Sequence, residues 1–477
     1  MNGNHRRTGM LALTAIVVNA MLSGIAFDLP RVTAFFAGPK MALAIWLLTG
    51  LTIFMVANTF RIIAEARPES SVGIYFNSRS GFGRFAGFEM AWLYWLRNIA
   101  VNGFYAMMLL DILDRALPGG SAGWIALVAV SLLLWIIHGF IALGFKPAAM
   151  VNLAGAALML TVLAGFIFFA ARAFDVQIFI ANWDAAAPPE TKLTPFLAVA
   201  IWTFAGIEGA AILADHGDDR RSVGRATLAG FWIALLVAPA LSLLPWGLAG
   251  RPELAQLGDL STAPLLTAIA GNRGGILMVA GNTLALLTGW LAFAIISIQV
   301  PRAAADDGAF PRAFCRLNRR GVPVFSLLAT GGLTQAVLIA LYFAGEKLAG
   351  LLPLAVLMVL APYLVSCGYL WKICLAGEYP IRMTSNRKFA HFCGAAGTLL
   401  VLALIVTAGI KYLLLAVTAA AIGLPVFIRA RNDAAAAPET APDDRRHFTG
   451  IEAVAAGLLV VAAMLVTAAV AAGWIDF

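Results

Sequence analysis

Apolar runs of about 20 residues recur along almost the whole of this 477-residue chain, and each is long enough to cross a bilayer as a helix. Inside lipid, only helices and closed barrels satisfy every backbone polar group. With 61% apolar and 12% charged residues, the composition fits an all-α integral membrane protein. Thirteen spanning segments are expected, near residues 10–37, 40–63, 85–114, 122–143, 147–171, 193–216, 224–248, 275–300, 325–345, 351–375, 393–409, 411–429 and 450–473.

Lysine and arginine are distributed unevenly between the two sets of loops. With the N-terminus inside, 23 of them lie in the inner loops or at the inner segment ends and 9 on the outer side, which leaves Arg97 inside the membrane. Such a bias marks the cytoplasmic side. We therefore expect a multi-pass protein of the inner (plasma) membrane with a cytoplasmic N-terminus. The net charge of +8 then reflects topology and not a nucleic acid partner. Thirteen segments put Phe477 outside, whereas merging the closely spaced eleventh and twelfth puts it inside.

Two of the segments are interrupted by residues that do not suit a continuous helix. The first interruption, Ser23 to Pro30, contains a glycine, the carboxylate of Asp28 and a proline, which cannot continue the hydrogen-bond ladder. The second, Trp202 to Gly209, encloses Glu208 between two glycines. Carboxylates at membrane depth are costly and usually face a cavity or a partner. Interrupted segments at corresponding places in two halves predict the binding site of a transporter.

Segments 1–5 and 6–10 each open with an interrupted helix. This arrangement predicts a LeuT-like fold of five plus five inverted helices with broken helices 1 and 6, followed by two or three additional helices. The loop 251–274 is expected to form a small cap or gate. The expected parts are a cytoplasmic N-terminus at 1–9, repeats at 10–172 and 193–376, additional helices at 377–430, a flexible cytoplasmic linker at 431–448 and a C-terminal helix at 449–477.

The sequence offers no catalytic or energy-coupling motif. It has no Ser-His-Asp set, zinc-ligand cluster or phosphate-binding loop, so we expect neither an enzyme, nor a cofactor or metal, nor transport driven by ATP. A membrane-embedded enzyme and a receptor or structural protein are the competing classes, because a transporter fold alone does not prove transport. Direct measurement of flux separates them.

Short motifs follow one another along the chain from about residue 10 to 430. They are Ser23-Gly-Ile-Ala-Phe-Asp-Leu-Pro30, Gly73-Ile-Tyr75, Gly81-Phe-Gly83, Gly87-Phe88, Trp92-Leu-Tyr94-Trp95, Phe204-Ala-Gly-Ile-Glu-Gly-Ala210, Val223-Gly-Arg-Ala-Thr-Leu-Ala-Gly-Phe231, Gly289-Trp290, Ala303-Ala-Ala-Asp-Asp-Gly-Ala-Phe-Pro311, Asn318 and Gly321-Val-Pro323. In this order they resemble the basic amino acid/polyamine antiporters of the amino acid–polyamine–organocation (APC) superfamily, nearest the arginine:ornithine branch. The resemblance implies a secondary active antiporter that exchanges arginine for ornithine or a related amine. Segments 1, 2, 6 and 7 would rock against the rest.

The backbone at the two interruptions suits the charged ends of an amino acid. An α-carboxylate suits the backbone N–H groups of an unwound stretch, here Ser23, Gly24 and Ile25. The resemblance implies that these residues bind the substrate α-carboxylate. Freed carbonyls at residues 202–206 would accept hydrogen bonds from the α-ammonium; the residues expected to supply them are Trp202, Ala205 and Gly206.

Three side chains are expected to contact the rest of the substrate. The resemblance implies that Trp202 and Trp290 sandwich its aliphatic chain and cationic end, and that Asn102 contacts its distal group. An indole face attracts such a cation by ~0.5–2 kcal/mol. The alternative for each tryptophan is a residue of the aromatic belt at the membrane interface.

Glu208, Asp28 and Arg97 are the candidates for gating or proton coupling. Asp28 stands where the resembled branch has asparagine, and Arg97 where a small residue is usual. If the two form an ion pair, each is less costly to bury. If Arg97 instead faces the cavity unpaired, it repels a dicationic substrate and favours a neutral or acidic amino acid, carried by exchange or by proton symport with Glu208 or Asp28 titrating. The expected partners are small amino acids or amines and the lipid bilayer, with a homodimer as one possible assembly.

Overall fold

The computed structural model describes residues 9–66, 73–116, 123–184, 193–214, 220–344, 352–380, 383, 385–435 and 448–472. Within these ranges, eleven helices are long and apolar enough to cross a membrane, and one further pair of helices forms a bent span. The described elements are helices and a single isolated bridge between Leu317 and Pro323. The prediction of an all-α membrane protein is confirmed. Residues 1–8 of the expected N-terminus (1–9) and residues 436–447 of the expected linker (431–448) lie outside the described residues.

The first half of the chain begins with a helix that is broken as the sequence predicts. Its two parts are bent by 40° at the break. The helices of this half are α1 (Met10–Leu22), η1 (Ala26–Asp28), α2 (Leu29–Phe36), α3 (Pro39–Ala66), α4 (Gly73–Phe82), α5 (Arg84–Ala116), α6 (Gly123–Ala142), α7 (Phe145–Arg172) and α8 (Val176–Asp184).

The second half also begins with a broken helix, formed by α9 and α10 in the expected segment 193–216. Its helices up to the tenth expected segment are α9 (Leu193–Phe204), α10 (Gly209–Ile212), α11 (Arg220–Leu243), η3 (Leu244–Gly247), α12 (Arg251–Ala255), α13 (Thr262–Ala270), α14 (Asn272–Asp306), η4 (Arg312–Cys315), α15 (Val324–Ala344) and α16 (Leu352–Leu375). The additional helices are α17 (Arg387–Thr407), α18 (Ile410–Ala435) and α19 (Gly450–Ala471). Segments 11 and 12 are thus two helices, separated at Gly409 with φ +91°.

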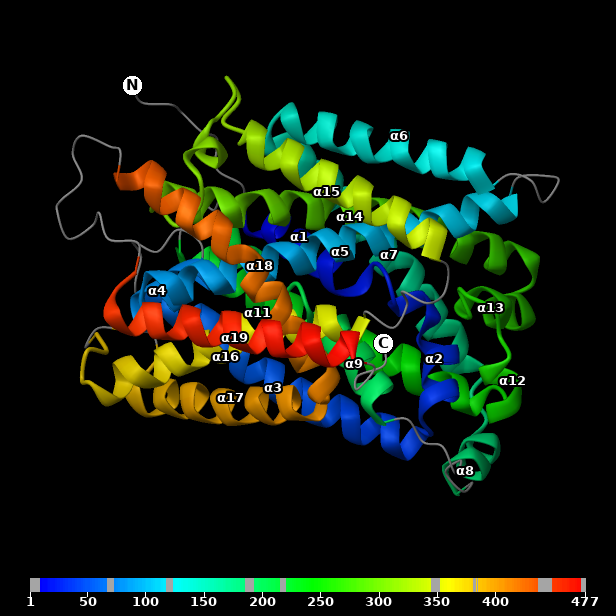
Figure 1. The fold of residues 1–477 in the computed structure, drawn as a ribbon. Coiled ribbons are helices and arrows are strands. Elements are labelled where there is room, and N and C mark those ends of the chain that lie inside the picture. The colour runs from blue at the N-terminus through cyan, green and yellow to red at the C-terminus, as the bar shows by residue number, and fades with distance from the viewer. Residues whose placement is uncertain are drawn as a thin grey trace.

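Short helices occupy four places between the spanning helices. The loop 251–274 contains α12 and α13, in keeping with a small cap, and α4 and α8 are helices that the sequence analysis did not anticipate. Figure 1 shows α8, α12 and α13 together at one end of the bundle and α4 toward the other. The two ends agree with the expected topology, in which the loop with α4 lies on one side of the membrane and the loops with α8, α12 and α13 lie on the other. Which end faces the cytoplasm stays a prediction.

The broken helices lie within the packed centre of the molecule. α1 packs against α7, α11 and α14, and α11 in turn packs against α3. α14 also packs against α5 and α7, and 83% of its most apolar stretch is buried. α19, by contrast, has 11% of that stretch buried and crosses the surface of the bundle (Figure 1). The centre is therefore where breaks in the backbone are shielded from lipid, as physical chemistry requires.

Candidate functional site

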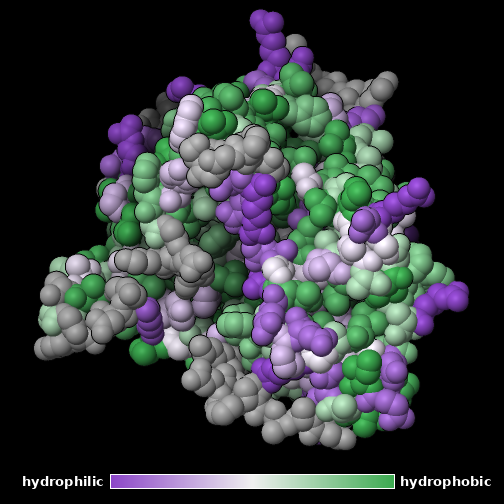
Figure 2. All heavy atoms as spheres, turned by 90° about the vertical axis from the view of Figure 1, so that its right-hand side faces the viewer, coloured by the Kyte–Doolittle hydropathy of each residue, from purple (hydrophilic) through white to green (hydrophobic). Residues whose placement is uncertain are grey.

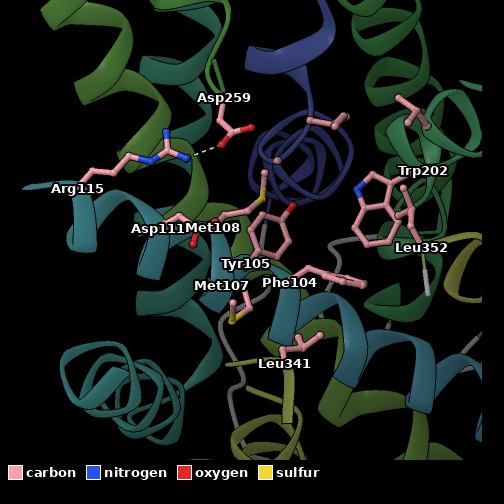
Figure 3. Close-up of a pocket in the computed structure, with 13 residues that line it drawn as sticks. Phe104, Tyr105, Met107, Met108, Asp111, Arg115, Trp202, Asp259, Leu341 and Leu352 are labelled. Carbon is pink, nitrogen blue, oxygen red and sulfur yellow. Dashed lines mark hydrogen bonds and ion pairs between the residues drawn. The ribbon is translucent and has the colours of Figure 1, made fainter. Parts of the chain in front are cut away.

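A cavity of about 580 Å³ lies between α5 and the break in α1. α5 supplies Phe104, Tyr105, Asp111 and Arg115, among others, and α9 supplies Trp202. Figure 3 shows the charged side chains on one side of the cavity and Trp202 with Phe104 on the other. At the end of the molecule that carries α12 and α13, hydrophilic side chains run down the middle of the face and recur at its edges, between hydrophobic ones (Figure 2). A cavity of this size, mostly apolar with a few polar groups, is typical of a small-molecule site.

The first break brings backbone donors to this cavity. Gly24 and Ile25 line it, and among the described residues their N–H groups donate to no acceptor. The hydroxyl of Ser23 donates to the carbonyl of Asn19 and lies 2.8 Å from the hydroxyl of Tyr105. Ser23 also fills the space beside Gly289, where any Cβ would collide with its Oγ. The break thus presents two free N–H groups where an anion can meet them.

The second break needs glycine at its centre. Gly206 has φ +128°, and a Cβ placed there would lie 2.6 Å from the Cβ of Ala20 on α1. Of the three carbonyls expected to be free, that of Trp202 accepts from Ala205 N at 3.0 Å and that of Gly206 accepts from Gly209 N at 2.9 Å. The carbonyl of Ala205 accepts no backbone hydrogen bond from the residues that the structure describes. The break is a tight turn in which the two half-helices pack directly on α1.

Glu208 holds this turn to two other helices. Its carboxylate accepts hydrogen bonds from the hydroxyl of Tyr94 on α5 at 2.6 Å, from the hydroxyl of Tyr363 on α16, and from Gly206 N at 3.1 Å. The residue is fully buried. A buried carboxylate with three donors is well solvated by the protein. Glu208 is therefore placed to couple the turn to α5 and α16, and it does not line the cavity.

Asp28 has its partners close by in the sequence. Its carboxylate accepts from Nε of Arg31 at 3.1 Å, forms a second, short contact with Nη2 of the same guanidinium, and accepts from Ser261 N at 3.3 Å. Arg31 also bonds Asp259 at 2.9 Å, and Asp259 pairs with Arg115. These contacts join α2, the loop before α13 and α5 at the charged side of the cavity. Asp28 does not pair with Arg97.

Arg97 lies deep in the protein, next to Trp202. It is 1% exposed, and its guanidinium carbon lies 5.6 Å from the ring centroid of Trp202 and 5.0 Å from that of Phe293. Nη1 donates to Oδ1 of Asn98 at 2.8 Å. Among the described residues Arg97 forms no ion pair, and its buried Nε has no hydrogen-bond partner. Arg97 is thus neither paired with Asp28 nor at the cavity surface; it lies in the wall against Trp202.

Comparison with known proteins shows which family the chain belongs to. The family model for amino acid permeases matches residues 9–427. This chain belongs to the amino acid permease family. A protein of Clostridium perfringens with the provisional name amino-acid transporter is 36% identical over 480 residues, covering 98% of both chains. Proteins named arginine/agmatine antiporter are 37% identical in Chlamydia trachomatis, over 88% of this chain and 89% of theirs, and 34% identical in Chlamydia felis, over 90% and 91%.

Family membership agrees with the expected APC superfamily and with the LeuT-like fold, and the relatives are transporters and not enzymes. The permease is a multi-pass membrane protein that transports amino acids. In the part of the chain that the structure describes, no group of three or more His, Cys, Asp or Glu side chains is arranged to hold a metal ion.

Five of the eight predicted substrate contacts do not line the permease's cavity; they are Ser23, Asn102, Ala205, Gly206 and Trp290. Trp290 is fully buried in α14, and its Nε1 has no hydrogen-bond partner among the described residues. Asn102 is also buried; its Nδ2 donates to Asn98 O at 2.7 Å and to Ser297 Oγ at 3.0 Å. Neither of these two side chains lines the cavity in this conformation, whereas Trp202 and Phe104 do. Their contact with substrate stays a prediction.

Several residues of the site were missed by the sequence analysis. Tyr94 and Tyr363 bind Glu208, and Tyr105 and Asp111 line the cavity. A signal existed on α5, because Phe104, Met108 and Asp111 recur at spacings of four and three residues and so share one face of the helix. No local signal connects Tyr363 to Glu208, 155 residues away.

Proposed function

We propose that this permease is a secondary active antiporter that exchanges one amino acid for a related amino acid or amine by alternating access. The observation that carries the proposal is the pair of free N–H groups at Gly24 and Ile25, which line the cavity at the break of α1. The partial positive charge at such a break suits a substrate α-carboxylate. The names of the relatives, arginine/agmatine antiporter, support exchange over one-way transport.

Arginine, exchanged for ornithine or a related amine, is the first candidate substrate. It rests on the names of the relatives and on the sequence motifs. The side chain would lie against Trp202, and the carboxylates of Asp111 and Asp259 would lie on the opposite side of the cavity.

A neutral or acidic amino acid is the second candidate, and one specific observation favours it. The cation nearest Trp202 is already part of the protein, since Arg97 lies 5.6 Å from that ring. Proton symport of such a substrate is the alternative mechanism, with Glu208 or Asp28 as the titrating group.

Uptake into proteoliposomes tests the proposal. Vesicles are preloaded with arginine, ornithine, agmatine, glutamate, glutamine or buffer alone, and uptake of labelled arginine and glutamate is followed. Exchange predicts uptake only when a substrate is inside. Uptake into buffer-loaded vesicles that requires an inward proton gradient would show symport instead, and no flux under any condition would contradict transport of these amino acids.

The proposed orientation places the permease in the inner (plasma) membrane with its N-terminus in the cytoplasm. It rests on the 23 lysine and arginine residues on the inner side against 9 on the outer side. Labelling of single cysteines introduced at exposed Gly258 and Gly377 tests it, since the first belongs to an outer and the second to an inner loop. A homodimer within the lipid bilayer stays a prediction, which the mass of the purified permease in nanodiscs checks.

A further inference from the structure

The wall of the cavity contains a cation that no described carboxylate neutralises. Arg97 lies against two aromatic rings, at 5.6 Å from Trp202 and 5.0 Å from Phe293. Within the described part of the chain its guanidinium makes one hydrogen bond, to Asn98, and its buried Nε makes none. A buried charge is costly unless it is paired. Buried arginine without an anion therefore points to a ligand that supplies one.

The two carboxylates that the sequence placed at the breaks are engaged with other partners. Asp28 pairs with Arg31 and accepts from Ser261 N. Glu208 accepts from two tyrosine hydroxyls and from Gly206 N. The charged side of the cavity has three carboxylates, those of Asp28, Asp111 and Asp259, and two arginines, Arg31 and Arg115. Arg97 is thus the charge that distinguishes the aromatic side of the cavity from the charged side.

We infer that Arg97 is a specificity-determining residue, and that it selects an acidic amino acid, one with a carboxylate in its side chain, over a cationic one. The inference rests on the proposed exchange function and names its substrate class. Trp202 lines the cavity, and the guanidinium carbon of Arg97 lies 5.6 Å from the centroid of its ring, so a substrate group on Trp202 lies within range of that charge. The α-carboxylate is left to the free N–H groups of Gly24 and Ile25.

Coulomb's law gives the size of the effect. A cation stacked on the open face of Trp202 would lie about 11 Å from Arg97, since each cation sits about 5–6 Å from the ring centre. Two unit charges at that distance, with an effective dielectric constant of about 20, change binding roughly tenfold. Arg97 is therefore expected to lower the affinity for a cationic side chain about tenfold and to raise the affinity for an anionic one about tenfold. Together these effects change the ratio of glutamate to arginine affinity about a hundredfold.

The first test measures equilibrium binding of labelled glutamate, glutamine and arginine to the purified, full-length permease in detergent. Glutamate is expected to bind more tightly than glutamine, and much more tightly than arginine. Arginine binding that equals or exceeds glutamate binding overturns the inference, whatever the variants below show.

The second test replaces the charge. In Arg97→Ala the ratio of glutamate to arginine affinity is expected to fall about a hundredfold. Arg97→Lys keeps the charge and is expected to keep the discrimination against arginine. Arg172→Ala is the matched control, because Arg172 also lies over an aromatic ring, that of Phe168 at 5.9 Å, but on the exposed end of α7 away from the cavity. A ratio that is unchanged in a folded Arg97→Ala overturns the inference; if that variant fails to fold, the wild-type ratio and Arg97→Lys decide.

Glutamine shows which carboxylate of the substrate Arg97 attracts. If Arg97 attracts the side-chain carboxylate, Arg97→Ala lowers the affinity for glutamate and leaves the affinity for glutamine unchanged. Equal weakening of both assigns Arg97 to the α-carboxylate and overturns the substrate class. Exchange is measured separately in proteoliposomes. If glutamate binds preferentially but no exchange occurs, the proposed antiport is refuted and the inference about Arg97 stands. If arginine alone is exchanged, the antiport stands and the inference is refuted.

Discussion

The carboxylate of Glu208, in the break of the sixth segment, accepts a hydrogen bond from the hydroxyl of Tyr94 at 2.6 Å. Tyr94 belongs to α5, which also lines the cavity and supplies Arg97 one turn further on. Through this contact and the matching one from Tyr363, a single buried side chain connects the break to two helices outside the bundle expected to rock. Movement of the broken helix must stretch or exchange these bonds.

Glu208→Gln is therefore expected to slow exchange more than it weakens substrate binding. The amide keeps the shape but loses the charge that both tyrosines solvate, and each hydrogen bond to a charged group contributes about 1.5–3 kcal/mol. Exchange rate in proteoliposomes and binding in detergent are compared in the same preparation. Tyr94→Phe, which leaves Glu208 charged, should destabilise the permease by about 1–3 kcal/mol. Collapse of binding in Glu208→Gln with normal turnover of bound substrate would make Glu208 a direct ligand instead.

Gly206→Ala is expected to abolish exchange and lower the thermal stability. The backbone at Gly206 is in a region that L side chains rarely adopt, at φ +128°, and the new methyl group would lie 2.6 Å from the Cβ of Ala20. Strain of this kind costs of order 1–3 kcal/mol before the clash is counted. The control is Gly165→Ala in α7, where the added methyl group meets nothing within 4 Å and is expected to be neutral or slightly stabilising. Wild-type exchange in Gly206→Ala would show that the turn at the break is dispensable.

Trp202→Ala and Trp290→Ala separate a cavity-surface tryptophan from a buried one. Trp202 lines the cavity, so its removal is expected to weaken substrate binding about tenfold with a modest loss of stability. Trp290 is fully buried, so its removal should cost about 3–5 kcal/mol of stability through the space it leaves. Binding is measured at a temperature well below the melting transition of each variant. Unchanged affinity in Trp290→Ala would remove its assignment as an aromatic clamp.

Cys315 provides a pH-dependent prediction on the loop that follows α14. Burial, aided by a hydrogen bond to Asp306, raises the pKa of its thiol to about 12. The thiolate is the reactive form, so labelling by maleimide should be slow at neutral pH and should rise about tenfold per pH unit without levelling off up to pH 10. The other three cysteines are buried. A labelling rate that levels off near pH 8.5 would show a thiol with an ordinary pKa.

The sequence by itself determined the class of protein, the spanning segments and the position of both breaks. These properties are local: a run of apolar residues needs no partner to prefer lipid, and glycine, proline or a carboxylate within it interrupts the helix wherever the chain goes. The break at Ser23 to Ile25 and the turn at Gly206 were predictable for that reason. The sequence left open whether the eleventh and twelfth segments are one helix, and the structure separates α17 from α18 at Gly409.

Only the tertiary structure decided which groups face one another. Asp28 and Arg97 were equally compatible with pairing and with separation until packing placed Arg31 beside the one and Trp202 beside the other. Tyr363 reaches Glu208 from 155 residues away, and Trp290 is buried and does not line the cavity. The charge of a side chain is set by its chemistry, but its partner, and with it the substrate that the site favours, is set by which helices pack together.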